Sequence, residues 1–218
     1  MDRRFKWSVA LLVGCAVFGN ALIGKVYAQD LDGLVEGHRD KGVELAQEIW
    51  RLAELGYQEN ESSAALRATL ESAGFSINTG VADIPTAFVA SYGEGESGTT
   101  IGILAEFDAL PGLSQVAEPI RRPRVNGGAG HACGHHLFGA ASVTAALAIK
   151  DWLQASGHPG QVKVFGTPAE EGGSGKVYMA RAGLFDDVDV VLHWHPGSAN
   201  SASPYATTSN KSGRFTFK

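Results

Sequence analysis

The stretch TTIGILAEFDALPG, residues 99–112, decides the fold. Its first half, Thr99–Ala105, is rich in β-branched and aliphatic residues and predicts a strand. Its second half turns polar at once, because Glu106 and Asp108 follow the strand directly. In open α/β sheets, ligands bind beyond the carboxyl ends of the strands. The stretch therefore predicts a strand together with one wall of a binding site.

Outward from this stretch, the spacing of apolar residues predicts helices and strands in alternation. Val43, Ala46 and Trp50 recur at intervals of three and four residues, which places them on one stripe of a helix. Strands that alternate with helices favour an α/β sheet covered on both faces. The predicted helices cover 33–55, 61–73, 137–155 and 176–182, the predicted strands cover 86–92, 99–105, 161–167 and a buried 188–194, and 111–135 is a long loop.

The composition excludes several classes of protein. The 218 residues are 44% hydrophobic and contain 28 glycines but only 2 cysteines, which is unlike a disordered chain, a collagen or a disulfide-rich scaffold. The formal net charge of −5 argues against a nucleic-acid-binding protein, which usually has a basic face. The composition is therefore that of a globular domain, and its many glycines indicate tight backbone turns.

Residues 1–28 have the layout of a secretory signal peptide. A charged start precedes an apolar run from Trp7 to Gly24, and Val26 and Ala28 stand at the −3 and −1 positions of a cut before Gln29. An uncleaved membrane anchor and lipidation at Cys15 are the alternatives. Cleavage predicts an exported protein, periplasmic or secreted, without stable membrane association, and it leaves Cys133 as the only cysteine.

The residue types of a metal site gather where predicted strands end. Cys133 and His135 lie two apart in a glycine-rich turn and can offer a thiolate and an imidazole to one cation. The pair Glu170 and Glu171 allows one carboxylate to bind metal while the other takes a proton from water. Each feature has a plain alternative: an inert buried cysteine, a solvated acidic pair, or histidines at 193 and 195 that cap a core. Their conjunction at one sheet edge favours a metal site, for which zinc, manganese, cobalt and nickel all remain open.

Four strings in this order resemble the M20 metallopeptidase family, and more narrowly its amidohydrolase branch. They are EFDALPG at 106–112, GHACGH at 130–135, TPAEEGG at 167–173 and HWHP at 193–196. The resemblance implies a zinc-peptidase-like α/β catalytic domain with a mostly parallel mixed sheet flanked by helices. It also implies two divalent ions in a complete site, zinc or manganese with cobalt or nickel as options. The implied metal ligands are Cys133, His135, Glu171 and His195, with Glu170 as general base and Asp108 orienting a ligand.

Two features depart from the family pattern. His136 follows the Cys-Gly-His string where Asp or Asn is common, so local hydrogen bonding or metal preference is expected to differ. The chain is also short, because family members carry a lid or dimerization domain inserted into the catalytic domain. We therefore predict the first part of the catalytic domain over 29–208 and the start of the inserted domain over 209–218.

The resemblance implies hydrolysis of the amide of an N-acyl amino acid, with p-aminobenzoyl-glutamate or a similar aroyl-glutamate as the leading substrate. A dipeptidase or another aminoacylase is the alternative within the enzyme class. Outside the enzyme class, the alternatives are a non-catalytic module that binds acyl amino acids and a partner subunit with a purely structural metal site. The full-length form is expected to be a homo- or hetero-oligomer, and this chain alone is expected to turn over substrate weakly or not at all.

Overall fold

The computed structural model describes residues 31–96, 98–201 and 213–217. The predicted signal peptide and residues 209–212 and 218 of the predicted inserted domain lie outside them, and residues 213–217 lie in no strand. Among the described residues, none of the helices combines the length and apolar character needed to cross a membrane. The elements run in the order α2 (Leu31–Gly37), α3 (Arg39–Leu52), α4 (Asn60–Ser72), β1 (Ser76–Thr79), η1 (Val81–Asp83), β2 (Phe88–Gly93), β3 (Thr99–Ala105), α5 (His135–Ser156), β4 (Gly160–Gly166), α6 (Glu170–Gly173), α7 (Gly175–Arg181) and β5 (Val190–Leu192).

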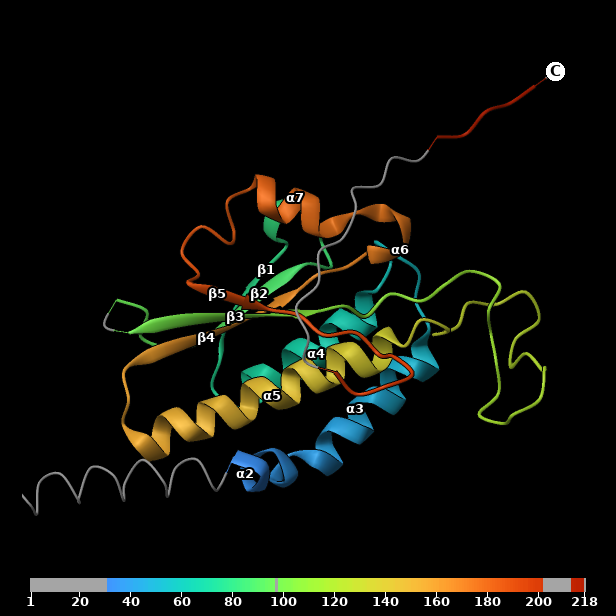
Figure 1. The fold of residues 1–218 in the computed structure, drawn as a ribbon. Helices are drawn as coiled ribbons and strands as arrows, with labels where there is room; N and C mark the ends of the chain where they lie inside the picture. Colours follow the sequence, from blue (N-terminus) through green and yellow to red (C-terminus); the bar gives the residue numbers. More distant parts are fainter. Residues whose placement is uncertain (1–30, 97, 202–212, 218) are drawn as a thin grey trace, which may run out of the picture.

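The strands form one mixed sheet in the order β1-β2-β4-β3-β5 (Figure 1). β4, β3 and β5 are parallel, whereas β2 pairs antiparallel with both β1 and β4. The mixed α/β sheet confirms the predicted fold class, although β1 and β2 make it less dominated by parallel pairing than expected. Ala105 pairs with Gly166, so β3 and β4 end side by side. The polar segments that follow them therefore start from the same sheet edge.

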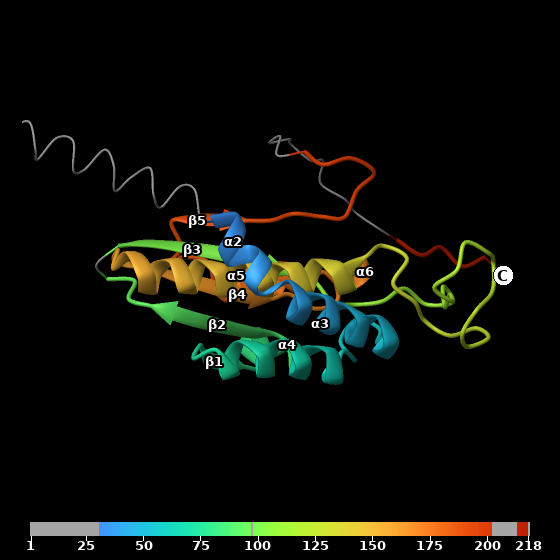
Figure 2. The same cartoon turned by 90° about the horizontal axis from the view of Figure 1, so that it is seen from below.

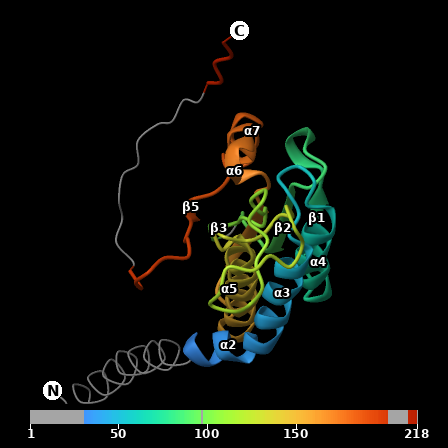
Figure 3. The same cartoon turned by 90° about the vertical axis from the view of Figure 1, so that its right-hand side faces the viewer.

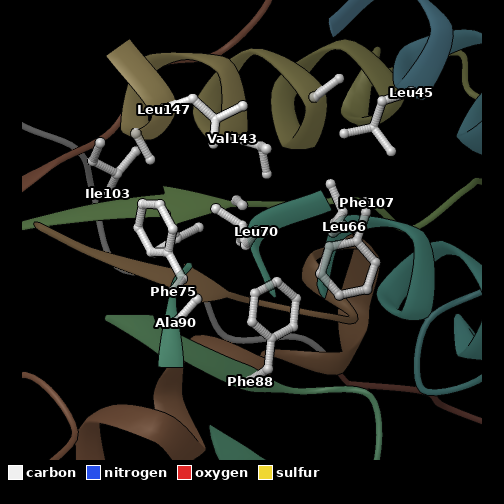
Figure 4. Close-up of a cluster of buried hydrophobic side chains, with 14 of the residues drawn as sticks. Leu45, Leu66, Leu70, Phe75, Phe88, Ala90, Ile103, Phe107, Val143 and Leu147 are labelled. Atoms are coloured by element: carbon white, nitrogen blue, oxygen red, sulfur yellow. The ribbon is translucent and has the colours of Figure 1, made fainter. Parts of the chain in front are cut away.

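Helices cover both faces of the sheet. α3, α4 and α5 lie on one side and α7 lies on the other (Figure 1), and Figure 2 looks onto the side with α3, α4 and α5. The larger core lies under α3, α4 and α5, where apolar side chains from the helices and strands point toward one another (Figure 4). Each leucine or phenylalanine fully buried there contributes about 1.5–3 kcal/mol of transfer free energy. A smaller cluster under α7 and η1 includes Leu104, Phe165 and Met179.

Two predicted elements differ from the structure in instructive ways. The helix predicted over 33–55 is broken at His38, whose φ of −105° and ψ of 2° are not helical, so α2 and α3 are separate. The strand predicted as buried over 188–194 is the short β5, and its three side chains are 41–49% exposed. The prediction of burial was wrong because β5 is an edge strand that pairs only with β3 among the described residues. Figure 3 shows β5 and β1 at opposite edges.

Candidate metal centre

The four predicted clusters converge at the carboxyl end of the parallel strands. Glu106 and Asp108 follow β3, and the Glu170–Glu171 pair follows β4 after a short turn. The Cys133 loop leads into α5, which His135 begins, and His195 comes from the segment after β5. The structure thus brings the predicted site segments to one sheet edge, as the strand-end argument requires. Among the described residues, Cys133, His135 and His195 form a close ligand group that does not include the predicted ligand Glu171.

His135 is the fully buried centre of the cluster. Its Nδ1–H donates to Asp108 Oδ1 at 2.9 Å, which leaves Nε2 as the ring atom for another partner. An imidazole oriented by a carboxylate is a common arrangement behind a metal ligand. Burial lowers the pKa of His135, but hydrogen bonds to Asp108 and Glu106 outweigh it and raise the pKa to about 10. A cation on Nε2 would replace the proton held there.

Cys133 and His195 lie close to His135 and are more exposed to solvent than it is. Cys133 Sγ lies 3.4 Å from His195 Nε2, and His195 Nδ1–H donates to the Pro196 carbonyl at 2.9 Å. One ligand atom from each of Cys133, His135 and His195 lies within 4.8 Å of the other two. Burial raises the pKa of the Cys133 thiol to about 11, helped by the neighbouring Glu171 carboxylate. A bound divalent cation would counter this effect by favouring the thiolate.

Asp108 also fixes Glu171, the fourth predicted ligand. Asp108 Oδ2 accepts the Glu171 backbone N–H at 2.9 Å, while its other oxygen holds His135. Glu171 Oε1 is buried and has no hydrogen-bond partner in the described part of the chain. One buried carboxylate thus contacts the ring of one predicted ligand and the backbone of another, and the orienting role of Asp108 stays a prediction.

Glu106 is a site residue that the sequence analysis did not select. Its buried Oε2 lies 3.0 Å from His135 Nε2, and its Oε1 contacts Lys176 Nζ at 2.5 Å. Burial alone would raise the pKa of the Glu106 carboxyl, but the cationic groups around it hold that pKa well below its usual range. Its place in the same strand-end string as Asp108 was the available signal. The Lys176 contact, contributed by α7, was not visible in the sequence.

Glu170 differs from Glu171 in its surroundings. Its side chain is 42% exposed, and its Oε2 lies 3.9 Å from His135 Nε2. Glu106, His135 and Glu170 form a second group whose ligand atoms lie within 4.8 Å of one another. His135 belongs to both groups but has only Nε2 to offer, so it can ligate one ion. Glu170 is the more exposed of the two adjacent glutamates, so its carboxylate is accessible from solvent.

The donor set fits a divalent metal ion. Glu171 Oε1 is buried without a hydrogen-bond partner in the described residues, which is costly unless another group binds it, and His135 Nε2 and Glu106 Oε2 face each other at 3.0 Å. Thiolate, imidazole and carboxylate are together the ligands of zinc and related transition metals. The predicted ligands thus meet the chemical requirement for such a site.

His136, the departure from the family pattern, contacts a second histidine. Its ring packs against His131 with centroids 5.1 Å apart, and His131 Nε2–H donates to the Ile49 carbonyl at 3.0 Å. Burial and the neighbouring His136 lower the pKa of His131 to about 4. The two rings form a neutral pair beside the metal-binding loop.

Fold and site together define an α/β domain of the metal-dependent hydrolase class. Residues 102–207 match the profile of Peptidase family M20/M25/M40, and the chain belongs to this family. It is 42% identical over 189 residues to a subunit of the p-aminobenzoyl-glutamate hydrolase of Escherichia coli K12, covering 86% of this chain and 39% of that protein. It is 35% identical over 169 residues to the Xaa-Arg dipeptidase of Mus musculus, covering 72% of this chain and 35% of the relative.

A solved structure supports the same assignment. A dinuclear metal binding peptidase of the M20 family from Bacillus subtilis superposes with a TM-score of 0.64 at 26% identity. The match covers 74% of this chain and 44% of that one. This chain therefore spans less than half the length of the relatives it matches. The M20 resemblance and the catalytic-domain fold predicted from the sequence are confirmed.

Proposed function

We propose that this chain supplies metal-binding and proton-transfer residues of an amidohydrolase that cleaves N-acyl amino acids. The observation that carries the proposal is the group of ligand atoms from Cys133, His135 and His195 within 4.8 Å of one another, with the exposed Glu170 carboxylate 3.9 Å from His135 Nε2. The likeness to the p-aminobenzoyl-glutamate hydrolase of Escherichia coli favours p-aminobenzoyl-glutamate or a related aroyl-glutamate as substrate. An oligomeric assembly is proposed on the same likeness, since that relative is named as one subunit of its enzyme.

Cys133, His135, Glu171 and His195 would hold the metal in this proposal. A bound divalent cation polarises a carbonyl and makes water acidic enough to act near neutral pH. Glu170 takes a proton from the attacking water as the new C–O bond forms. The same carboxyl then gives that proton to the nitrogen as the amide C–N bond breaks, so that a carboxylic acid and a free amine leave. Asp108 keeps His135 and Glu171 in place throughout.

The adjacent pair Glu170 and Glu171 provides the test. The protein is purified as its own gene expresses it, its metal content is measured, and release of p-aminobenzoate from p-aminobenzoyl-glutamate is followed. Glu170→Gln is expected to keep the metal and lose at least about 100-fold in turnover. Glu171→Gln is expected to lose metal as well. Full turnover by the Glu170→Gln variant would refute the catalytic role of Glu170.

Export is also part of the proposal, because residues 1–28 have the layout of a cleaved signal. Sequencing the amino terminus of the protein recovered from the periplasm or medium tests it. A mature chain that begins at Gln29 supports export. An intact Met1 on a protein found only in the cytoplasm contradicts it.

A further inference from the structure

The turn that carries the two adjacent glutamates has an unfavourable backbone. Ala169 and Ser174, which flank α6, have φ values of 56° and 59°, in the left-handed region. Glu171 is non-helical as well, with a ψ of 63°. Each non-glycine residue in the left-handed region costs about 1–2 kcal/mol. Such conformations persist only where neighbouring groups hold them, so the residues that hold this turn set the position of the candidate ligand Glu171.

Glu59 holds the beginning of the turn. It is fully buried, its Oε1 accepts the Ala169 backbone N–H at 2.8 Å, and its Oε2 accepts the Thr86 hydroxyl at 3.0 Å. Burial raises the pKa of Glu59, and none of the described residues forms an ion pair with it. A carboxylate in such a place is costly, which indicates that its bonds to the turn have a use.

Helix capping does not account for Glu59. It precedes α4 at the N-cap position, yet its side chain makes no capping hydrogen bond. Glu54 does that instead, because its carboxylate accepts the backbone N–H groups of Glu61 and Ser62 at 3.1 and 2.7 Å. The Glu59 side chain is therefore free to bind the distant turn, 110 residues further along the chain.

Tyr57 holds the end of the same turn. Its hydroxyl donates to the Gly173 carbonyl at 2.5 Å, and its own φ of 65° is left-handed. The packing leaves no space for a side chain at position 173. A Cβ at Gly173 would lie 2.5 Å from Ala169 Cβ and 2.8 Å from the Tyr57 ring. A Cβ at Gly56 would lie 3.0 Å from Ala169 Cα and Cβ. The segment 56–59 thus packs closely against both ends of the turn.

We propose that Glu59 and Tyr57 are positioning residues of the metal centre. Glu59 fixes the Ala169 end and Tyr57 fixes the Gly173 end, so that the Glu171 N–H meets Asp108. This inference rests on the proposed metal site. It assigns to the segment before α4 a function in metal binding rather than in substrate contact.

Cobalt titration of the purified chain tests the inference. All variants carry Cys15→Ser, so that the thiolate-to-cobalt charge-transfer band reports Cys133 alone. The parent chain is titrated first, and absence of that band in the parent would overturn the proposed metal site itself. Glu59→Ala is expected to weaken Co²⁺ binding by about 10–100-fold, as loss of an outer-shell partner commonly does.

Glu59→Gln is the rescue variant and Glu61→Gln is the matched control. The amide that Glu59→Gln introduces keeps an acceptor for the Ala169 N–H and can donate to the Thr86 hydroxyl, so its affinity should stay within about threefold of the parent. Glu61 is exposed on the first turn of α4, and its change should have no effect. Parent affinity in Glu59→Ala, or equal losses in Glu59→Ala and Glu59→Gln, would overturn the role of the Glu59 acceptor.

Tyr57→Phe keeps the inference testable if Glu59→Ala does not fold. Tyr57 is 41% exposed, so removing its hydroxyl should preserve the fold. We expect about 3–10-fold weaker Co²⁺ binding, as loss of one hydrogen bond near 1 kcal/mol implies. The intensity of the charge-transfer band at saturation should also change, which a purely structural role would not produce. Unchanged affinity and an unchanged spectrum would refute the role of Tyr57.

Discussion

Replacing Asp108 by Asn tests the geometry of the candidate metal centre most directly. The variant preserves side-chain size, but its amide offers one oxygen where Asp108 uses two. Both present partners, the His135 Nδ1–H and the Glu171 backbone N–H, are donors. The Asn NH₂ group must therefore face one of them, so at least one of the two ligands loses its support.

The expected magnitude follows from these two bonds. A hydrogen bond to a charged group contributes about 1.5–3 kcal/mol, and removing an outer-shell partner weakens metal binding by about 10–100-fold. That range corresponds to about 1.4–2.7 kcal/mol of binding free energy. Because Asp108 is buried, the metal-free variant should also lose about 1–3 kcal/mol in free energy of unfolding. For a domain of this size, each kcal/mol lowers the melting temperature by about 2–4 °C.

The assay is a zinc competition titration against a chromophoric chelator, with thermal unfolding of the metal-free protein measured in parallel. Asp40→Asn is the control, because Asp40 is exposed on α3 and forms none of the ion pairs found in the described residues. Zinc affinity within about twofold of the parent in Asp108→Asn would refute the reasoning. It would mean that neither His135 nor Glu171 depends on this carboxylate.

Two further substitutions test the packing around the site. Lys176→Met removes a cation from buried Glu106 and should lower the free energy of unfolding at pH 7 by about 1–3 kcal/mol in urea titrations. The folded-state pKa of Glu106 is lowered from 4.5, so the stability that its ionised carboxylate provides is present above pH 4.5 and is lost as the pH falls through the folded-state value. The difference in unfolding free energy between parent and variant should therefore shrink in acid. A difference that stays constant with pH would contradict this account. Gly166→Ala places a Cβ 2.1 Å from the buried Phe88 ring and should cost about 1–3 kcal/mol, measured by thermal unfolding. Gly37→Ala, with open space around the new Cβ, should be neutral or slightly stabilising, and equal losses in the two glycine variants would refute the steric argument.

Much of the fold was predictable because it rests on local patterns. The apolar stripe of α3 and the aliphatic β3 indicated their elements directly. The break at His38 was missed, although no apolar residue lies between Val35 and Val43 and Gly37 directly precedes the break. The burial assigned to β5 failed for a related reason: an apolar strand predicts burial only if another element packs on it, and that depends on the tertiary structure.

The residue types of the candidate site were predictable from the sequence. The long-range contacts that hold those residues in place were not. Cys133 and His135 are rare together in a glycine-rich turn, and this made them visible in the sequence. Glu106 was overlooked as a site residue because its importance comes from Lys176, 70 residues away. Glu59 left no signal either, since acidic residues are common near the start of a helix. These long-range hydrogen bonds depend on the fold and have no local sequence pattern.

The exposed edge of β5 has a practical consequence for handling the protein. Val190, Val191 and Leu192 present aliphatic side chains on a strand with one unpaired edge among the described residues. Unprotected apolar edges recruit strands from other molecules, and natural proteins usually blunt them with charge or proline. Concentrated solutions of this chain are thus expected to self-associate through β5. A lysine at position 191 would protect this edge against aggregation.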